Sequence, residues 1–142
     1  MALDGELWTK RDDFQNAVSI VRKQDKSDRW KQITYMVYDA PLLDTKFKQR
    51  LETIKKVLSS KPSLYVKLHE HTECKDQAHL DEEMDKVLAQ KGEGLMIKDP
   101  NSYYESCRSE KLLKVKKFDD TEAVVIGHLK GTGRCFNMCG AI

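Results

Sequence analysis

The chain has 142 residues, of which 39% are hydrophobic and 34% are charged, and its formal net charge is +2. This length and apolar content suit one compact domain with its own core. No apolar run approaches the ~20 residues of a membrane-spanning helix, so the sequence predicts none. Residues 1–6 lack the basic and apolar regions of a signal peptide, so none is expected in this chain.

Hydrophobic periodicity predicts strands and helices that alternate along the chain. The predicted strands span 2–8, 33–39, 64–69, 95–97, 112–117 and 123–128, and the predicted helices span 11–23, 45–59 and 80–88. Phe14 and Phe47 begin the apolar stripes of the first two helices, and both stripes are expected to pack inward. Several strands carry charges where a doubly wound core would be apolar. We therefore expect an α+β fold with mixed, largely antiparallel sheets flanked by helices.

Basic residues gather late in the chain, although the mean charge is small. The cluster comprises Arg108, Lys111, Lys114, Lys116 and Lys117. A local basic stripe can follow phosphates even in a nearly neutral protein, and a solvated lysine-rich surface explains the same composition equally well. The four cysteines show no C-x2-C spacing, so we expect reduced thiols and no structural zinc site.

Charges in the predicted strands occupy alternate positions, and alternate side chains point to the same face. Asp4 and Glu6 share a face in this way, as do Lys114 and Lys116, and Glu93 stands just before the apolar run 95–97. Paired lysines neutralise a phosphoryl group, and carboxylates bind hard divalent cations. The strands therefore predict a polar groove suited to nucleotide chemistry. Edge strands also carry lysine as protection against aggregation. The lysine pair alone therefore does not decide between a phosphate-binding groove and a protected edge strand.

Four segments occur in an order that resembles a known set of motifs. They are Leu3-Asp4-Gly5-Glu6-Leu7-Trp8, Tyr35-Met36-Val37-Tyr38-Asp39, Glu93-Gly94-Leu95-Met96-Ile97-Lys98 and Leu112-Leu113-Lys114-Val115-Lys116. They resemble the third, intervening aromatic, fourth and fifth motifs of the covalent nucleotidyltransferases, the superfamily of DNA ligases and mRNA capping enzymes. The Glu93-Gly94-Leu95-Met96-Ile97-Lys98 segment and the Arg108-Ser109 step look most like ATP-dependent DNA ligases of the minimal bacterial and viral type. The resemblance covers essentially the whole chain.

The resemblance implies a nucleotidyltransferase core, of ATP-grasp-like ligase type, that uses ATP and Mg²⁺ on nicked double-stranded DNA. It implies that Glu6 contacts the ribose and that Tyr38 lies against the adenine ring. Tyr38 as a buried core aromatic remains the alternative.

The same resemblance implies that Glu93, with Glu6, places the metal ion near the α-phosphate. Lys114 and Lys116 would then be the catalytic lysines that contact the phosphate oxygens, and Arg108 would help to hold the nick phosphate or the nucleotide. For both glutamates, an ordinary surface carboxylate remains the alternative. Met36, Leu95 and Met96 are expected in the core.

The nucleophilic lysine of the family lies in a Lys-x-Asp-Gly motif, which occurs nowhere in this chain. We therefore expect residues 1–118 to be a partial adenylation domain that is inactive alone. Residues 119–142 resemble the start of an oligonucleotide-binding (OB) domain, with 123–128 as its first strand. The parent enzyme is expected to be a monomer, located in the nucleus or another DNA-containing compartment if it is eukaryotic.

Two other functions remain open from the sequence. The chain could be a non-catalytic remnant that binds nucleotide or nucleic acid without the nucleophile. It could also belong to a related RNA ligase or an mRNA capping nucleotidyltransferase. A Lys-x-Asp-Gly segment upstream would favour the ligase over the non-catalytic remnant. Binding of ATP rather than GTP would distinguish the ligase from a capping enzyme, and a preference for DNA nicks over RNA nicks would distinguish it from an RNA ligase.

Overall fold

The computed structural model describes residues 1–24, 27–118 and 120–142, which form seven strands and three α-helices within those ranges. The strands are β1 (Asp4–Trp8), β2 (Thr34–Asp39), β3 (Val66–Leu68), β4 (Gly94–Lys98), β5 (Leu112–Lys116), β6 (Leu129–Lys130) and β7 (Cys139–Ala141). The helices are α1 (Phe14–Val21), α2 (Phe47–Ser60) and α3 (Gln77–Ala89), with 3₁₀ turns η1 (Asp28–Gln32) and η2 (Gly133–Cys135).

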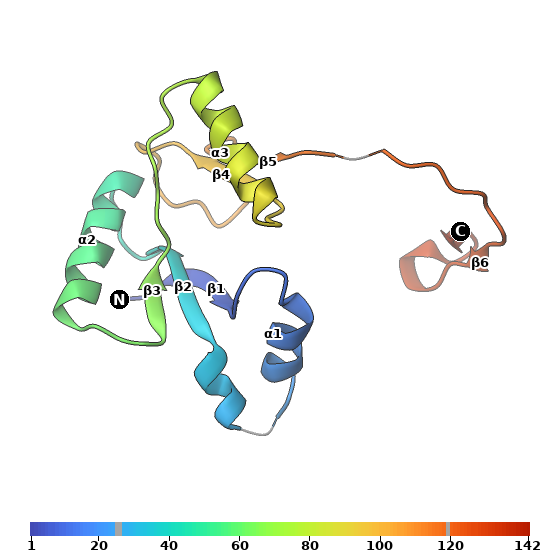
Figure 1. Cartoon of the computed structure of the whole chain (residues 1–142), viewed down its shortest axis with the longest axis horizontal. Coiled ribbons are helices and arrows are strands. Elements are labelled where there is room, and N and C mark those ends of the chain that lie inside the picture. The colour runs from blue at the N-terminus through green and yellow to red at the C-terminus, as the bar shows by residue number, and fades with distance from the viewer. Residues whose placement is uncertain (25–26, 119) are drawn as a thin grey trace.

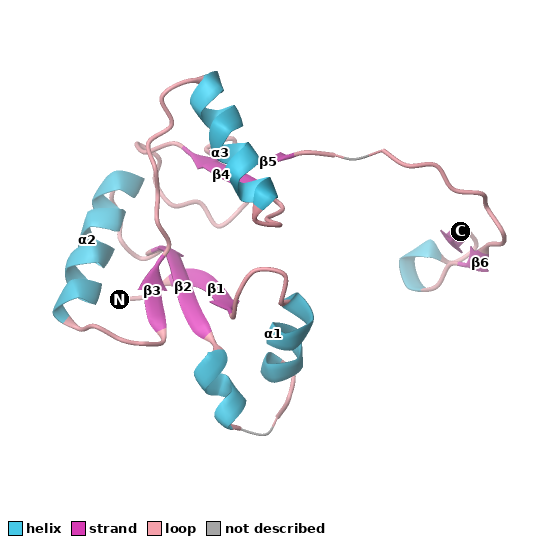
Figure 2. Ribbon diagram, viewed as in Figure 1, coloured by secondary structure: helices cyan, strands magenta, loops and turns pink. Residues whose placement is uncertain are grey.

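The strands form three small sheets (Figure 2). In the first sheet, β2 lies between β1, which is antiparallel to it, and β3, which is parallel. Strands β4 and β5 form an antiparallel pair, and β6 and β7 form another. The predicted α+β class with mixed, largely antiparallel sheets is therefore confirmed.

The core lies between α2 and the three-stranded sheet. Val37, Ala40 and Ile54 are completely buried there, and Leu58 packs against them. Phe47, at the start of α2, is also buried, as its predicted stripe requires. The first backbone amides of α2 have no partner within the helix, and two of them donate to carbonyl oxygens of Pro100 and Ser102 in the loop after β4. The second helix is thus fixed to both the first sheet and the β4–β5 region.

The sequence predicted the wrong buried face for the first helix. Phe14 is 72% exposed, and the buried residue of α1 is Ile20. Polar contacts set this orientation: the Arg29 guanidinium donates to the side-chain oxygens of Asn16 and Ser19 at 2.7 and 2.8 Å. These bonds turn the Asn16 side of α1 toward η1, and the Phe14 end of the stripe faces away.

The predicted strand 123–128 was also wrong, because those residues have no regular structure. Ile126 is 98% exposed, and the next strand begins only at Leu129. A strand needs a neighbour to satisfy its backbone groups, and the β6–β7 hairpin lies well apart from the rest of the chain (Figure 1). The domain division after residue 118 stays a prediction, and Asp119 lies outside the described residues. No helix in the described part of the chain is long and apolar enough to cross a membrane.

Candidate functional site

Glu6 and Tyr38 are brought together by the pairing of β1 with β2. Glu6 lies opposite Met36, and a register shift between Asp4 and Gly5 leaves Tyr38 between two paired positions of β2. The Tyr38 hydroxyl donates to Glu6 Oε2 at 2.8 Å. Burial, together with this bond, raises the pKa of Tyr38 well above its usual value.

The Tyr38 ring is only half-buried, unlike Val37 and Asp39 on either side of it. Its edge-to-face neighbour is His69, just after β3, with ring centroids 5.4 Å apart. Alternation along the strand separates Tyr38 from the core, which contains Val37. Tyr38 therefore lies outside the fully buried core, and its contact with the adenine ring stays a prediction.

Glu93, Lys114 and Lys116 form a second group. Lys114 and Lys116 alternate along β5 and therefore share a face, and Glu93 stands in the turn that leads into β4. The ammonium of Lys116 lies 2.8 Å from Glu93 Oε2, and that of Lys114 lies 3.7 Å from the same oxygen. The hydrogen bond from Lys116 lowers the pKa of Glu93, and the same bond raises the pKa of Lys116. Two cations thus converge on one anionic oxygen.

A glycine next to each site carboxylate lets the strands approach closely. A side chain at Gly5, beside Glu6, would collide with the backbone of Met36. Gly94 follows Glu93, has φ +151°, and would place a side chain against the Val115 carbonyl oxygen. Glycine alone adopts that backbone region readily. The two glycines therefore allow the pairings that place Glu6 and Glu93.

The two groups lie on different sheets. Within residues 1–24, 27–118 and 120–142, no hydrogen bond or ion pair joins Glu6 or Tyr38 to the Glu93 group. A hollow of about 520 Å³ is lined by Lys114 and Lys116 with Leu113, Val115 and Phe118. Arg108 is exposed in the loop between β4 and β5. The single groove that the sequence predicts therefore stays a prediction.

Met96 is not in the core, contrary to the sequence expectation. It is 56% exposed and lies opposite Lys114 in the β4–β5 pair. Its position in the strand places it on the lysine-bearing face, whereas its neighbours Leu95 and Ile97 lie on the other face. Leu95 is half-buried.

A buried ionic cluster was missed by the sequence interpretation. The carboxylate of Asp39 accepts hydrogen bonds from Arg50 Nε at 2.6 Å and Arg50 Nη2 at 2.9 Å, and it also accepts one from Lys98. Burial acts to raise the pKa of Asp39, but the bonds from Arg50 and Lys98 outweigh it and hold the pKa below its usual value. Arg50 was hidden because arginine in an amphipathic helix is normally assigned to the solvent face.

The carboxylates suit Mg²⁺ only in combination with a substrate. Among the described residues, no three acidic, histidine or cysteine side chains gather into a metal site. Mg²⁺ is usually held by one or two carboxylates together with substrate phosphates and water. Glu93, in an exposed position beside the ammonium groups of Lys114 and Lys116, fits that pattern.

The mixed α+β fold, and the order of the strands that carry Glu6, Tyr38, Glu93, Lys114 and Lys116, agree with the nucleotidyltransferase class that the sequence motifs resemble. Comparison with known proteins agrees. The family model of the ATP-dependent DNA ligase domain matches residues 1–116. The chain therefore belongs to the ATP-dependent DNA ligase family.

Individual relatives are also DNA ligases. A DNA ligase of Haemophilus influenzae is 35% identical over 141 residues, which are 99% of this chain and 52% of that protein. A solved structure from an analysis of Lig E DNA ligases matches with a TM-score of 0.88 and 34% identity, over 97% of this chain and 55% of that one. The Chlorella virus DNA ligase–adenylate matches with a TM-score of 0.69 and 27% identity, over 89% and 51%.

The chain spans about half the length of these relatives. The comparisons confirm the predicted family and its minimal bacterial and viral-like type.

Proposed function

We propose that this chain supplies nucleotide-binding residues to an ATP-dependent DNA ligase that seals nicks in double-stranded DNA through a lysine–AMP intermediate. The observation that carries the proposal is the convergence of Lys114 and Lys116 on one carboxylate oxygen. A phosphate oxygen, like that carboxylate oxygen, is an anionic acceptor of charge-assisted hydrogen bonds from lysine. The lysine pair is thus already arranged around an anion.

The proposed role of each residue follows from its surroundings. Tyr38 offers a half-buried ring on which the adenine stacks, a contact worth about 1–3 kcal/mol in exposed base sites. Glu6, which accepts the Tyr38 hydroxyl bond, stands beside that ring and accepts a ribose hydroxyl. Arg108 extends from an exposed loop toward the nick phosphate or the nucleotide.

The phosphate end of the nucleotide belongs to the second group. Lys114 and Lys116 leave Glu93 for the α-phosphate and offset the charge that builds up in the transition state. Glu93, once released, and Glu6 are the proposed metal-binding carboxylates. Mg²⁺, when bound, would supply further neutralisation of the phosphates.

The chain alone is expected to form no covalent AMP adduct. It contains no Lys-x-Asp-Gly segment, and the lysines of the site face Glu93 as cations, which makes them poor nucleophiles. The measurement is incubation with ATP labelled at the α-phosphate and Mg²⁺, followed by denaturing electrophoresis. The Haemophilus influenzae ligase serves as the positive control. Acid-labile AMP on any lysine of this chain would contradict the proposal of inactivity.

The same preparation distinguishes the related functions. ATP binding without GTP binding supports the ligase over a capping enzyme, and retention of nicked DNA over nicked RNA supports a DNA ligase over an RNA ligase. Residues 119–142 would extend the adenylation domain toward an OB domain. A monomer is expected in sedimentation. Binding of ATP by this chain, combined with no adduct even when a Lys-x-Asp-Gly segment is supplied, would favour the non-catalytic module.

A further inference from the structure

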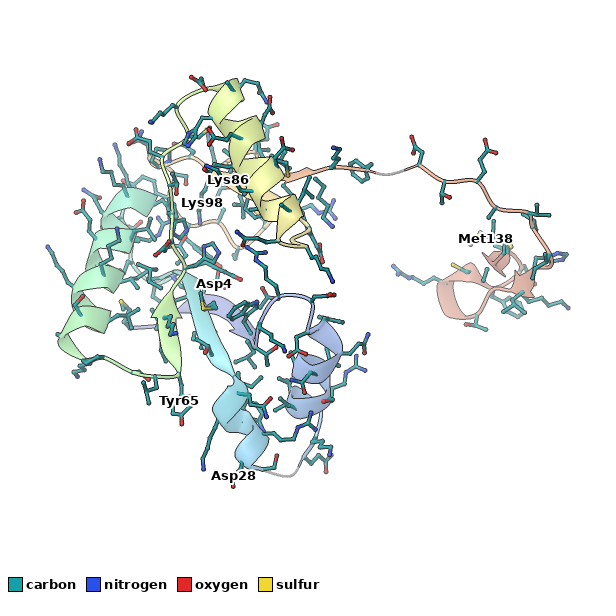
Figure 3. The ribbon with its side chains drawn as sticks, viewed as in Figure 1. Asp4, Asp28, Tyr65, Lys86, Lys98 and Met138 are labelled. Carbon is teal, nitrogen blue, oxygen red and sulfur yellow. The ribbon has the colours of Figure 1, made fainter. Side chains whose placement is uncertain are left out.

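The two residue groups of the proposed site lie on separate sheets, so something must fix their relative position. The contact that does this most directly is the bond between Lys98 and Asp39. Asp39 follows Tyr38 in β2, and Lys98 ends β4, the strand that Glu93 precedes. The bond therefore joins β2, which contains Tyr38, to β4, which follows Glu93 and pairs with the strand of Lys114 and Lys116. Figure 3 labels Lys98 in the region between the β4–β5 pair and the three-stranded sheet.

Lys98 is aligned with the phosphate-binding lysines. In the β4–β5 register, Lys98 lies opposite Leu112, Met96 opposite Lys114, and Gly94 opposite Lys116. Directly opposite residues point to the same face of the pair, and Gly94, Met96 and Lys98 alternate along β4. Lys98, Lys114 and Lys116 therefore share one face of the pair. A change in where Lys98 is anchored would rotate or shift the face that contains the other two lysines.

The partner of Lys98 is fixed in place. Asp39 and Arg50 are 1% and 0% exposed, and the Arg50 guanidinium holds both carboxylate oxygens of Asp39. Arg50 Nη1 also donates to the carbonyl oxygens of Thr45 and Ser102. Asp39 is thus a rigid anchor, attached to α2 and to the loop that follows β4.

Aromatic rings hold the Lys98 ammonium on this anchor. The ammonium lies 4.4 Å from the centre of the Phe47 ring and 5.6 Å from that of the Tyr104 ring. The Tyr104 hydroxyl in turn donates to Asp4 in β1 at 3.0 Å. Cation–π contacts of this kind have a preferred geometry and attract a partly desolvated cation.

Charge balance alone does not require Lys98. Arg50 already neutralises Asp39 through two bonds, and a second largely buried cation adds a desolvation cost. Buried ionic groups of this kind can serve to define one arrangement of a fold rather than to stabilise it. Lys98 is the member of the cluster that comes from the β4–β5 pair.

We infer that Lys98 is a positioning residue: its bond to Asp39 holds the β4–β5 pair, with Glu93, Lys114 and Lys116, against the sheet that carries Glu6 and Tyr38, so that one nucleotide contacts both groups. The nucleotide part of this inference rests on the proposed function. The geometric part does not, because it concerns only the relative orientation of the two sheets.

The geometric part is tested by residual dipolar couplings of backbone amides in the whole chain. In the unmodified chain, one alignment tensor is expected to fit both sheets. In Lys98→Met and Lys98→Gln, the two sheets are expected to require different tensors, and Lys98→Arg restores a single one. Lys111→Met is the matched control, because Lys111 is an exposed lysine that pairs with Asp99 at 3.8 Å next to β5.

The nucleotide part is tested by calorimetry with ATP, which would span both groups, and adenosine, which would contact only the Glu6–Tyr38 group. Lys98→Met is expected to lower ATP affinity about tenfold, which corresponds to roughly 1.4 kcal/mol, because ATP could then no longer contact both groups fully at once. Adenosine affinity should be unchanged. Loss of folded protein would lower the binding of ATP and adenosine alike, so it would not produce this difference.

A single tensor in both Lys98→Met and Lys98→Gln would overturn the inference. Global unfolding of both variants would also overturn it, because Lys98 would then be a stability residue. If the unmodified chain binds neither ATP nor adenosine, the proposed function fails, and the dipolar couplings still decide the geometric part. Equal losses of ATP and adenosine affinity would overturn the nucleotide part.

Discussion

Replacing Arg50 with methionine is expected to lower the free energy of unfolding by about 3–5 kcal/mol, the usual cost of breaking a buried ion pair by removing one partner. Arg50 is completely buried and donates to both oxygens of Asp39, which is itself 1% exposed. The substitution leaves the carboxylate with Lys98 and the Ala40 amide as its remaining partners. Since a domain of this size is normally stable by 5–15 kcal/mol, much of the chain would unfold under mild denaturation.

Urea unfolding followed by circular dichroism measures this effect. Lys86→Met is the control, because Lys86 is an exposed lysine that pairs with Glu82 and Glu83 on α3. Exposed pairs contribute about 0–1 kcal/mol, so the control should unfold close to the unmodified chain. A cost for Arg50→Met no greater than that of the control would show that the cluster does not stabilise the fold.

Replacing both Lys114 and Lys116 with methionine is expected to lower the affinity for ATP about 100-fold. Each charge-assisted hydrogen bond to a phosphate oxygen contributes roughly 1.5–3 kcal/mol, and two losses of about 1.4 kcal/mol already give this factor. Adenosine has no phosphate, so its affinity should not change. Isothermal calorimetry on the whole chain provides both values.

The matched control is the double variant Lys111→Met with Lys117→Met. Both of these lysines are exposed, flank the same strand and give the same change in net charge. If the control loses as much ATP affinity as the Lys114 and Lys116 variant, the phosphates respond to the general positive charge of this region. In that case Lys114 and Lys116, the two lysines within β5, would have no special role.

Local pattern was enough to predict most of the elements. Alternating charges and apolar residues indicated the strands that contain Glu6, Lys114 and Lys116, because the period of two is a property of the strand itself. The strand that contains Tyr38 was predicted from its β-branched and aromatic residues. Helix α2 was found from its stripe for the same reason. The motifs, rather than periodicity, supplied the family and the expected roles.

What depends on distant partners was not predictable. The burial of Arg50 requires Asp39, eleven residues away, and Ser102, 52 residues away. The orientation of α1 depends on Arg29, and the region 123–128 has strand-forming residues without a neighbouring strand. The pairing of Glu93 with Lys116 crosses 23 residues. These contacts are set by tertiary structure, which overrides local preference.

The central claim is that Glu6 and Tyr38 bind the same nucleotide as Glu93, Lys114 and Lys116. Titration of the ¹⁵N-labelled chain with ATP and Mg²⁺, followed residue by residue through amide chemical shifts, tests it most directly. We predict that signals of both groups shift together and give one dissociation constant. Shifts confined to one group, or two separate constants for the two groups, would contradict the claim.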